Sequence, residues 1–290
     1  MDVSEHQPSG IPLSFEFFPP RTEEGVIRLR QTRARLNDLL SPEYFSVTFG
    51  AGGSTRDRTF ETAVEIGAEH KAPVAPHISC IGATGSAVRE MLTAYAGVGI
   101  KRIVALRGDL PSGAVYQGEL PHAIELVQMI RQHLGDDMHI SVAAYPEKHP
   151  EASDLLTDLE YFADKVRAGA NAAITQYFFN PDAYFRFLDD CRRHHIPDIP
   201  IVPGIMPITN AGQLIRFSTM CGAEIPRWLK LRLEVLADDQ TALEEYGCDV
   251  VATLCERLLA GGAPGLHFYS LNKADPVLNI CARLGLKAQP

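Results

Sequence analysis

Eight short apolar runs recur along the chain, most at intervals of roughly 27–38 residues, which is about the length of one strand–helix unit. Each run is short and rich in β-branched or aromatic residues, as buried strands are. We expect strands over residues 13–18, 44–49, 74–80, 102–107, 139–145, 172–178, 199–206 and 266–271.

The segments between these runs carry apolar residues every three or four positions, as amphipathic helices do. Leu155, Leu159, Phe162 and Val166, for example, would share one helix face. We expect helices over residues 26–40, 155–168, 213–220 and 227–259. The last of these is unusually long, and Gly247 predicts a break within it.

Strands that alternate with helices, without a linker or a shift in composition, favour a parallel sheet in one domain. Eight strands in 290 residues suit a (β/α)8 TIM barrel, which typically needs about 250 residues. We therefore expect a single α/β barrel over residues 1–290, with residues 1–11 as a flexible amino-terminal tail.

Polar residues interrupt six of the apolar runs near their carboxyl ends. In a TIM barrel this is the end where catalytic residues lie. The residues are Glu16, Thr48, His77, Arg107 with Asp109, Tyr145 and Gln176. A solvated surface would not place a polar group at the same end of successive strands, so the pattern predicts an active site there.

Charge and composition narrow the classes of function. The chain has 27 Lys and Arg against 36 Asp and Glu, a net charge of −9. Without a basic cluster, nucleic acid and anionic membranes are poor partners. No apolar stretch is long enough for a membrane span, and the amino terminus lacks the apolar core of a secretory signal. Six scattered cysteines without a CxxC pair indicate reduced thiols, so we expect a cytoplasmic protein.

Glu16 is the strongest candidate for acid chemistry. Phe15, Phe17 and Phe18 flank it, and a carboxyl group that loses hydration among aromatics has a raised pKa. A raised pKa suits a general acid near neutral pH. The alternative is a barrel-interior Glu that pairs with an Arg or Lys of a neighbouring strand.

The other candidates also allow two interpretations. Arg107 and Asp109 could bind an anion and a ring N–H, or could pair with each other to close the loop. Gln176 could recognise a heterocycle, or could bond loop backbone. The glycine-rich segment 48–59 lacks a nucleotide fingerprint and could approach a flat ligand or form a tight turn. His77 and His149 lack metal-ligand spacing, so no metal is expected.

Eight motifs taken together resemble the 5,10-methylenetetrahydrofolate reductase family. They keep their order over nearly the entire chain. The motifs are FEFFPPRT (15–22), VTFGAGGSTRDRT (47–59), PHISCIGAT (76–84), IVALRGDLP (103–111), VAAYPEKHPEA (142–152), AGANAAITQYFF (168–179), PIVPGIMPI (200–208) and HFYSLNKA (267–274). The resemblance implies a (β/α)8 barrel that binds FAD.

The resemblance also implies roles for individual residues toward the folate. Glu16 matches the general acid that protonates N10 of the folate, and Asp109 the carboxylate beside the pterin and flavin. The remaining substrate positions are Gln176, Gln213, Phe217 and Lys273. Lys273 stands where some members have Arg, which keeps the charge but loses the guanidinium fork.

Further positions match those that contact FAD in the family. They are Thr48, Ala51, His77, Arg107, Gly108, Asp109, Ala123, Tyr145, His149, Asp158 and Lys165. Tyr161 and Asp164 differ from the Asn and Arg of some bacterial members. Asp164 cannot donate to a phosphate as Arg would, so contacts on the adenosine side are expected to differ.

The implied reaction is a ping-pong hydride transfer from NADH or NADPH through FAD to methylenetetrahydrofolate, in a homo-oligomer. The sequence shows no dinucleotide fingerprint that would choose between the two donors. Three alternatives stay open: direct transfer from nicotinamide to folate without FAD, a non-redox pterin-binding transferase on the same barrel, and a binding protein without activity.

Overall fold

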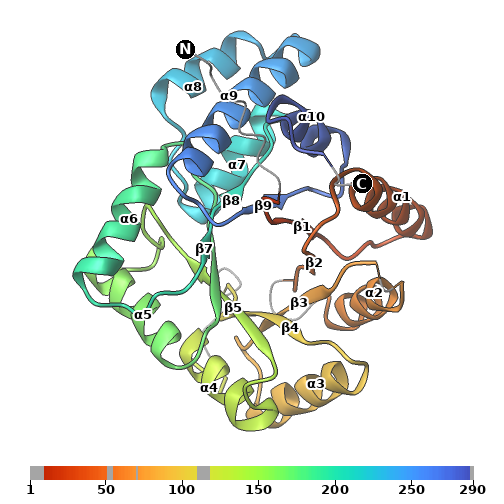
Figure 1. The fold of residues 1–290 in the computed structure, drawn as a ribbon, viewed down its shortest axis with the longest axis vertical. Helices are drawn as coiled ribbons and strands as arrows, with labels where there is room; N and C mark the ends of the chain where they lie inside the picture. The colour runs from red at the N-terminus through yellow and green to blue at the C-terminus, as the bar shows by residue number, and fades with distance from the viewer. Residues whose placement is uncertain (1–9, 51–54, 70, 110–117, 288–290) are drawn as a thin grey trace.

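The computed structural model describes residues 10–50, 55–69, 71–109 and 118–287. In this part of the chain a curved parallel sheet is surrounded by helices (Figure 1). The strands are β1 (Leu13–Phe17), β2 (Tyr44–Val47), β3 (Val74–Ser79), β4 (Arg102–Leu106), β5 (His139–Ala144), β6 (Ala172–Thr175), β7 (Ile201–Val202), β8 (Gly204–Ile205) and β9 (Leu266–Tyr269). The predicted TIM barrel is confirmed. The predicted tail, residues 1–11, falls almost wholly outside the described residues.

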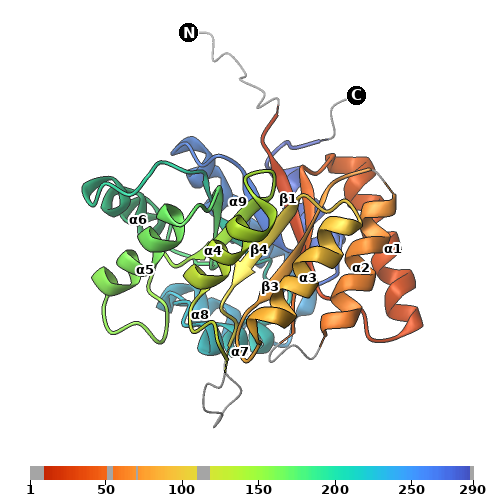
Figure 2. The ribbon, with the colours of Figure 1, turned by 90° about the horizontal axis from the view of Figure 1, so that it is seen from below.

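Helices separate most of the strands and, apart from α7 and α8, surround the outer side of the sheet (Figure 1 and Figure 2). They are α1 (Glu23–Leu40), α2 (Arg56–Ala68), α3 (Gly85–Gly97), α4 (Ala123–Leu134), α5 (Leu155–Arg167), α6 (Pro181–Arg193), α7 (Ala211–Cys221), α8 (Arg227–Val235), α9 (Gln240–Ala260) and α10 (Asp275–Arg283). Several begin at polar caps: the side chain of Asp154 accepts from the N–H of Thr157 at the start of α5, for example.

The barrel closes at Pro203, which divides the predicted seventh strand in two. β7 pairs with β6, whereas β8 pairs with β9, so the two halves join different neighbours. Proline has no amide hydrogen and cannot continue the ladder on both sides. Its carbonyl accepts from the N–H of His267 (3.0 Å), and the N–H of Gly204 donates to Oγ1 of Thr175 (2.9 Å). These bonds link the last strands to the rest of the sheet.

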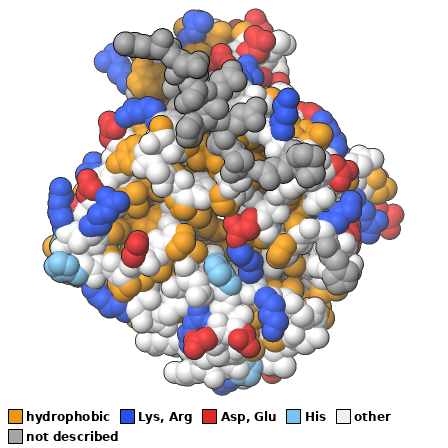
Figure 3. Space-filling view, viewed as in Figure 1, with side chains coloured by type: hydrophobic (Ala, Val, Ile, Leu, Met, Phe, Trp, Pro, Cys, Tyr) orange, Lys and Arg blue, Asp and Glu red, His pale blue; other side chains and the backbone are white. Residues whose placement is uncertain are grey.

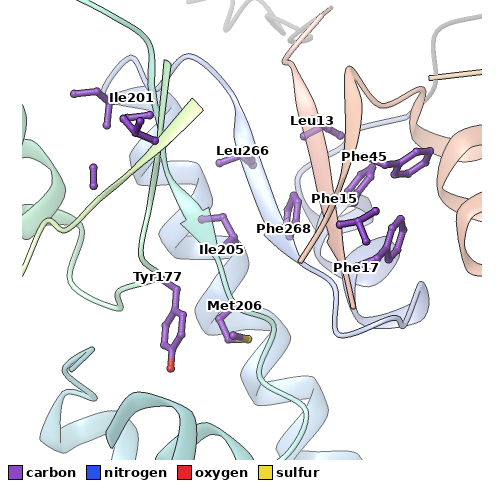
Figure 4. Packing of buried hydrophobic residues seen from close by; sticks show 14 of the residues in the cluster. Leu13, Phe15, Phe17, Phe45, Tyr177, Ile201, Ile205, Met206, Leu266 and Phe268 are labelled. Atoms are coloured by element: carbon purple, nitrogen blue, oxygen red, sulfur yellow. The ribbon is translucent and has the colours of Figure 1, made fainter. Parts of the chain in front are cut away.

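Phenylalanines on the outer side of β1, β2 and β9 anchor the helical layer. Phe15, Phe17 and Phe45 lie together beside β1 and β2 (Figure 4). The rings of Phe15 and Phe268 stack with centroids 5.9 Å apart. Each ring is buried, and full burial of a Phe side chain stabilises the fold by about 1.5–3 kcal/mol. Because side chains alternate along a strand, Ser14 and Glu16 face the barrel interior.

The long helical segment before the last strand divides at a different place from the one predicted. α8 ends at Val235, and Asp239 caps α9 by accepting from the N–H of Ala242 (3.0 Å). The predicted break near Gly247 is wrong, because Gly247 lies inside α9. A Cβ there would lie 2.5 Å from the carbonyl oxygen of Ile208, so the glycine permits close packing.

The two mouths of the barrel differ in character. Figure 3 views the amino-terminal mouth and shows acidic, basic and histidine side chains interspersed near its centre. Here Arg102 pairs with Glu43 (2.6 Å) at the start of β4. α7 and α8 lie at the opposite, carboxyl-terminal mouth (Figure 2). No helix among the described residues is both long and apolar enough to cross a membrane.

Candidate active site

The carboxyl-terminal mouth collects the polar residues singled out in the sequence. Glu16 and His77 lie within β1 and β3, and the others directly follow the strands β2, β4, β5 and β6; they are Thr48, Arg107, Gly108, Asp109, Tyr145 and Gln176. All strands are parallel, so these positions share one mouth. Ala51 lies outside the described residues.

Glu16 is enclosed by two histidines from other strands. Its Oε2 lies 3.2 Å from Nε2 of His77 on β3 and 3.5 Å from Nε2 of His267 on β9. Nδ1 of His267 is hydrogen-bonded to Oγ of Ser14 at 2.7 Å. The strand register explains this arrangement, since Ser14 aligns with His267 and Glu16 with Tyr269. Residues two apart on a strand point to the same side, here the barrel interior.

The histidines decide the charge of Glu16. Burial alone raises the pKa of Glu16, but the attraction of His77, together with the contacts from His267, outweighs burial and lowers the pKa to about 2. The expected raised pKa is therefore wrong for the protein without ligands, and Glu16 is a carboxylate. Of the phenylalanines that suggested otherwise, Phe15 and Phe17 point away from Glu16 into the core beside the helices, and Phe18 is exposed to solvent. The expected Arg or Lys partner is also replaced by histidine.

Three residues around Glu16 were not among the candidates from the sequence: Ser14, His267 and Tyr269. The hydroxyl of Tyr269 donates to the carbonyl of Thr175 (2.7 Å), and burial raises the pKa of Tyr269. A signal was present, because His267 and Tyr269 alternate with apolar residues on the last strand. In a closed barrel the last strand lies beside the first, so these two side chains had to flank Glu16.

Arg107 is the main cation of the loop after β4. Its Nη1 donates to Glu151 (2.6 Å), so the suggested pair between Arg107 and Asp109 is not the one formed. Its Nη2 is buried without a hydrogen-bond partner among the described residues. Gly108 has a φ of 89°, and any Cβ there would collide with Oγ of Ser79. The backbone of this loop therefore requires glycine. Asp109 follows with an exposed carboxylate.

A second cation comes from α5. Nζ of Lys165 donates to the carbonyl of Ala143 on β5 (2.6 Å), and burial lowers the pKa of Lys165 to about 8 against the opposing charge of Asp158. Asp158 accepts from the N–H of His149 (2.8 Å). The ring of Tyr145 meets His149 edge to face with centroids 4.6 Å apart. These contacts bring four of the predicted cofactor positions together.

Gln176 and Tyr145 line one small cavity together with Cys221 at the end of α7. Oε1 of Gln176 accepts from the N–H of Tyr177 (3.0 Å), which is the backbone contact that one interpretation of the sequence expected. The hydroxyl of Tyr177 in turn contacts Oγ of Ser218 (3.1 Å). α7 is thereby held against the end of β6.

The remaining substrate candidates lie farther out at the same mouth. Gln213 and Phe217 are half-buried on α7, where Asn210 accepts from the N–H of Gln213 (2.8 Å). Lys273 is exposed in the turn after β9. Within the described chain no hydrogen bond or ion pair joins these three side chains to Glu16. The structure places them around the mouth but leaves their roles a prediction.

The two departures from the family pattern lie on α5 beside the start of α4. Tyr161 is half exposed and stacks on His122, with ring centroids 5.8 Å apart and planes at 19°. His122 immediately precedes Ala123, one of the predicted cofactor positions. Asp164 faces solvent and pairs with Arg167 (3.5 Å). Tyr161 and Asp164 thus present an aromatic ring and a carboxylate where some bacterial members of the family would present the amide of Asn and the cation of Arg.

The chemistry of this mouth suits an anionic, partly aromatic ligand. Arg107 and Lys165 supply positive charge, and Arg107 retains a buried, unpaired N–H. In the part of the chain that the structure describes, no group of three or more His, Cys, Asp or Glu side chains could hold a metal ion. Glu16 and the two histidines beside it, His77 and His267, could serve in acid–base catalysis.

Comparison with known proteins assigns the family. The sequence model described as methylenetetrahydrofolate reductase matches residues 4–285. The chain belongs to the methylenetetrahydrofolate reductase family. The 5,10-methylenetetrahydrofolate reductase of Escherichia coli (strain K12) is 41% identical over 277 residues, which cover 96% of this chain and 92% of that protein. Methylenetetrahydrofolate reductase (NADH) 1 of Arabidopsis thaliana is 38% identical and is covered over 48% of its length.

A solved structure shares the barrel of this reductase family member at much lower sequence identity. It is an uncharacterised protein from Clostridium thermocellum that binds two copies of 5-methyl-5,6,7,8-tetrahydrofolic acid, with a TM-score of 0.64 and 18% identity. The match covers 94% of this chain and 93% of that one. At this identity the likeness establishes the fold alone.

Proposed function

We propose that this protein reduces 5,10-methylenetetrahydrofolate to 5-methyltetrahydrofolate, with NADH or NADPH as the donor and FAD as the bound cofactor. The observation that carries the proposal is Glu16, a carboxylate only 12% exposed and held between His77 and His267 at the carboxyl-terminal mouth of a barrel of this family. A carboxyl group in this position is what acid-assisted opening of the folate ring requires.

Glu16 would deliver the proton that opens the five-membered ring of the substrate. Protonation of N10 breaks its bond to the methylene carbon and leaves a 5-iminium cation on the folate. The contacts to His77 and His267 give the ionised Glu16 two neighbours from which to take a proton. A bound substrate that displaces water from this mouth would also favour the neutral carboxyl form.

The other substrate positions would bind and orient the folate. The exposed carboxylate of Asp109 would accept hydrogen bonds from the pterin and favour the iminium cation electrostatically. Gln176 and Gln213 would contact the folate through their amides, and Phe217 would pack against it. Lys273 would supply a positive charge near the folate. These roles follow from the family positions and the location of each residue at the same mouth.

The cations and backbone of the neighbouring loops would hold FAD. Arg107 offers an unpaired, buried N–H, and Lys165 a charge with one carbonyl partner, which suits a diphosphate. Gly108 allows close approach of a flat ring to the backbone. The full set is Thr48, Ala51, His77, Arg107, Gly108, Asp109, Ala123, Tyr145, His149, Asp158 and Lys165. Once bound, FAD would carry hydride between the nicotinamide donor and the folate.

The donor and the folate would use this mouth in turn, which makes the kinetics ping-pong. One flat site shared by both explains why few residues distinguish NADH from NADPH. The alternative is direct hydride transfer without FAD, which is favoured by the single observation that Asp164 faces solvent where a phosphate-binding Arg stands in some relatives. A non-redox pterin transferase would leave the donor unoxidised.

The visible absorption spectrum of the purified protein tests the proposal. We expect a flavin spectrum that bleaches when NADH or NADPH is added without oxygen and recovers when methylenetetrahydrofolate follows. The donor that bleaches it faster is the preferred one. Folate reduction without bound flavin, even after incubation with FAD, would favour direct transfer. Failure to oxidise either donor would favour the non-redox pterin-binding transferase.

A further inference from the structure

The two histidines beside Glu16 differ in what surrounds them. Each has its Nε2 near the same oxygen, Oε2 of Glu16, at 3.2 Å for His77 and 3.5 Å for His267. The side chain of His267 is fully buried, whereas that of His77 is 9% exposed. Among the described residues His77 has no further hydrogen bond or ion pair from its ring, but His267 is also bonded to Ser14. One carboxylate therefore meets one restrained and one unrestrained imidazole.

Two hydroxyl groups restrain His267 through the ring nitrogen that does not face Glu16. Oγ of Ser14 lies 2.7 Å from Nδ1 of His267. The hydroxyl of Tyr44 is hydrogen-bonded to Ser14 in turn, in agreement with the strand register, which aligns these two residues. The rings of Tyr44 and His267 lie nearly parallel, with centroids 6.0 Å apart and planes at 25°. A buried chain of three side chains thus leads from Tyr44 to Glu16.

Tyr44 keeps its proton and is itself held in place. Burial, the largest cause, raises the pKa of Tyr44 to about 12, so its hydroxyl group is protonated near neutral pH. The guanidinium of Arg102 stands over the Tyr44 ring, 5.0 Å from its centroid, and pairs with Glu43 at the amino-terminal mouth (2.6 Å). Tyr44 can therefore donate a hydrogen bond from a fixed position.

The charge of Glu16 sets the direction of every hydrogen bond in this chain. A carboxylate can only accept, so the Nε2 of His267 that faces Glu16 carries a hydrogen. This nitrogen has no other hydrogen-bond partner among the described residues. In a neutral imidazole Nδ1 then accepts, so Ser14 donates to Nδ1 and its oxygen accepts from Tyr44. Every hydrogen of the chain has an acceptor in this arrangement.

A second proton on His267 would disturb this pairing. Its Nδ1–H would donate to Ser14, and the hydroxyl hydrogen of Ser14 would need a new acceptor. If Ser14 turned toward the oxygen of Tyr44, the hydroxyl hydrogen of Tyr44 would lose its acceptor instead. A buried donor without an acceptor is unfavourable. The chain therefore favours neutral His267, whereas nothing comparable restrains His77.

We propose that the two histidines have different tasks. Ser14 and Tyr44 fix His267 as a neutral donor that positions Glu16. His77 alone supplies the proton that Glu16 delivers. This inference rests on the proposed function, in which Glu16 acts as the acid.

The proton would move in three steps. Cationic His77 passes the hydrogen of its Nε2 to the carboxylate of Glu16, which leaves neutral His77 and a carboxylic acid. The acid gives this proton to N10 of the folate, and the bond from N10 to the methylene carbon breaks with its electron pair on N10. His77 then regains a proton from solvent, to which its side chain is partly open.

Nitrogen-15 NMR of the imidazole side chains tests the assignment without substrate, because ring nitrogens with and without a hydrogen differ widely in chemical shift. We expect His267 to keep one neutral form, with its hydrogen on Nε2, from about pH 8 to about pH 5.5. His77 should take up a second proton in this range. His267→Gln and His77→Asn assign the signals by their absence.

The groups around His267 allow this titration to be interpreted. Its titratable neighbours are Glu16, Tyr44 and Tyr269, the last edge-on with ring centroids 5.6 Å apart. Burial raises the pKa of both tyrosines, so they stay protonated throughout the range. Glu16 is the neighbour whose charge acts on both histidines. A difference between their titrations therefore reports the restraint by Ser14 and Tyr44.

Two variants weaken that restraint. Ser14→Ala removes the donor to Nδ1, so His267 should lose its single tautomer and gain a second proton at the acid end of the range. Folate reduction should slow about tenfold or more, whereas flavin reduction by the nicotinamide donor should change little. Tyr44→Phe should have the same effects to a smaller degree, roughly two- to fivefold on folate reduction. In that variant Ser14 remains and loses only the donor that polarises it.

Ser46→Ala and Tyr95→Phe are the matched controls. They make the same chemical changes at buried hydroxyl groups that have no hydrogen-bond partner among the described residues. The imidazole signals and both half-reactions should stay as in the unsubstituted protein.

Separate outcomes would overturn the proposal and the function on which it rests. A His267 that takes up a second proton together with His77, or that carries its hydrogen on Nδ1, would overturn the proposal. An altered tautomer in Ser14→Ala with unchanged folate reduction would remove His267 from positioning Glu16. The expected imidazole signals in a protein that reduces no folate would instead overturn the proposed function. The role of His77 would fall with it, while the fixed tautomer of His267 would stand.

Discussion

Oε2 of Glu16 lies 3.2 Å from Nε2 of His77, although the strands that carry them, β1 and β3, are not neighbours in the sheet. The contact crosses β2 at Ser46, which is in register with Glu16 and is small enough to leave the space open. It places a base and an acid next to each other at the mouth where the folate would bind. The first two predictions concern this pair.

Glu16→Gln should separate the two half-reactions. The amide keeps the size of the side chain but cannot donate an acidic proton, so folate reduction should fall by about 10²–10⁴-fold. Transfer from the nicotinamide donor to the flavin needs no such proton and should change little. Stopped-flow absorbance of each half-reaction measures both. Glu43→Gln, at the opposite mouth, is the control, and equal loss of both half-reactions in Glu16→Gln would remove Glu16 from the acid role.

His77→Asn should raise the pKa of Glu16. The attraction of His77 is the largest contribution that opposes burial and keeps this pKa near 2. Without it, burial acts with less opposition, and the carboxyl group should titrate at a higher pH. NMR of protein labelled with ¹³C at the Glu carboxyl carbons, with Glu16→Gln to assign the signal, gives the value directly. An unchanged titration would show that His77 does not set the charge of Glu16.

The strands were predictable from the sequence because each is a short apolar run that recurs at a regular interval. The division of the seventh strand was not predictable, because it depends on Pro203 separating one apolar run into two strands with different neighbours. The helix break was misplaced for a similar reason. A glycine within a helix indicates either a break or a close contact, and only the position of Ile208 shows that Gly247 serves a contact.

The gathering of the candidate residues at one mouth was predictable from the sequence, but their electrostatics were not. Residues at strand ends could be listed, since parallel strands bring those ends together. The charge of Glu16 depends on His77 and His267, which are far from it along the chain and reach it only through the strand register. The local sequence showed phenylalanines beside Glu16, but Phe15 and Phe17 point to the opposite side of the strand from Glu16.

His139→Gln should make the protein less sensitive to acid. Burial, followed by the nearby charge of Arg102, lowers the pKa of His139, and its Nδ1 is buried without a hydrogen-bond partner among the described residues. The imidazole of His139 therefore binds a proton more tightly in the unfolded chain than in the folded protein. As a result, the stability of the fold decreases as the pH drops below about 6.5. Urea unfolding at pH 7.5 and pH 5.5 measures this loss. It should be smaller in the variant, and an equal loss would contradict the assignment.

Lys165 should make FAD binding depend on pH. Its pKa is about 8, so the side chain is cationic below this pH and neutral above it. If Lys165 contacts the diphosphate, affinity for FAD should fall as the pH rises through 8. Quenching of FAD fluorescence on binding gives the dissociation constant. Lys165→Arg keeps its charge throughout this range, so its affinity should vary less with pH. An equal dependence in both proteins would place the titrating group elsewhere.

Gly247→Ala should destabilise the barrel, although alanine is the better helix former. The added Cβ would lie 2.5 Å from the carbonyl oxygen of Ile208 and 2.8 Å from its Cβ, and backbone atoms cannot move aside cheaply. Overpacking of this kind costs about 1–3 kcal/mol. Gly212→Ala in α7 is the matched control, because the nearest atom to its Cβ is 3.5 Å away. There the gain in helix propensity should stabilise the protein by up to about 1 kcal/mol. Urea denaturation of the three proteins measures both effects, and similar shifts in the two variants would mean that α9 can move away from Ile208.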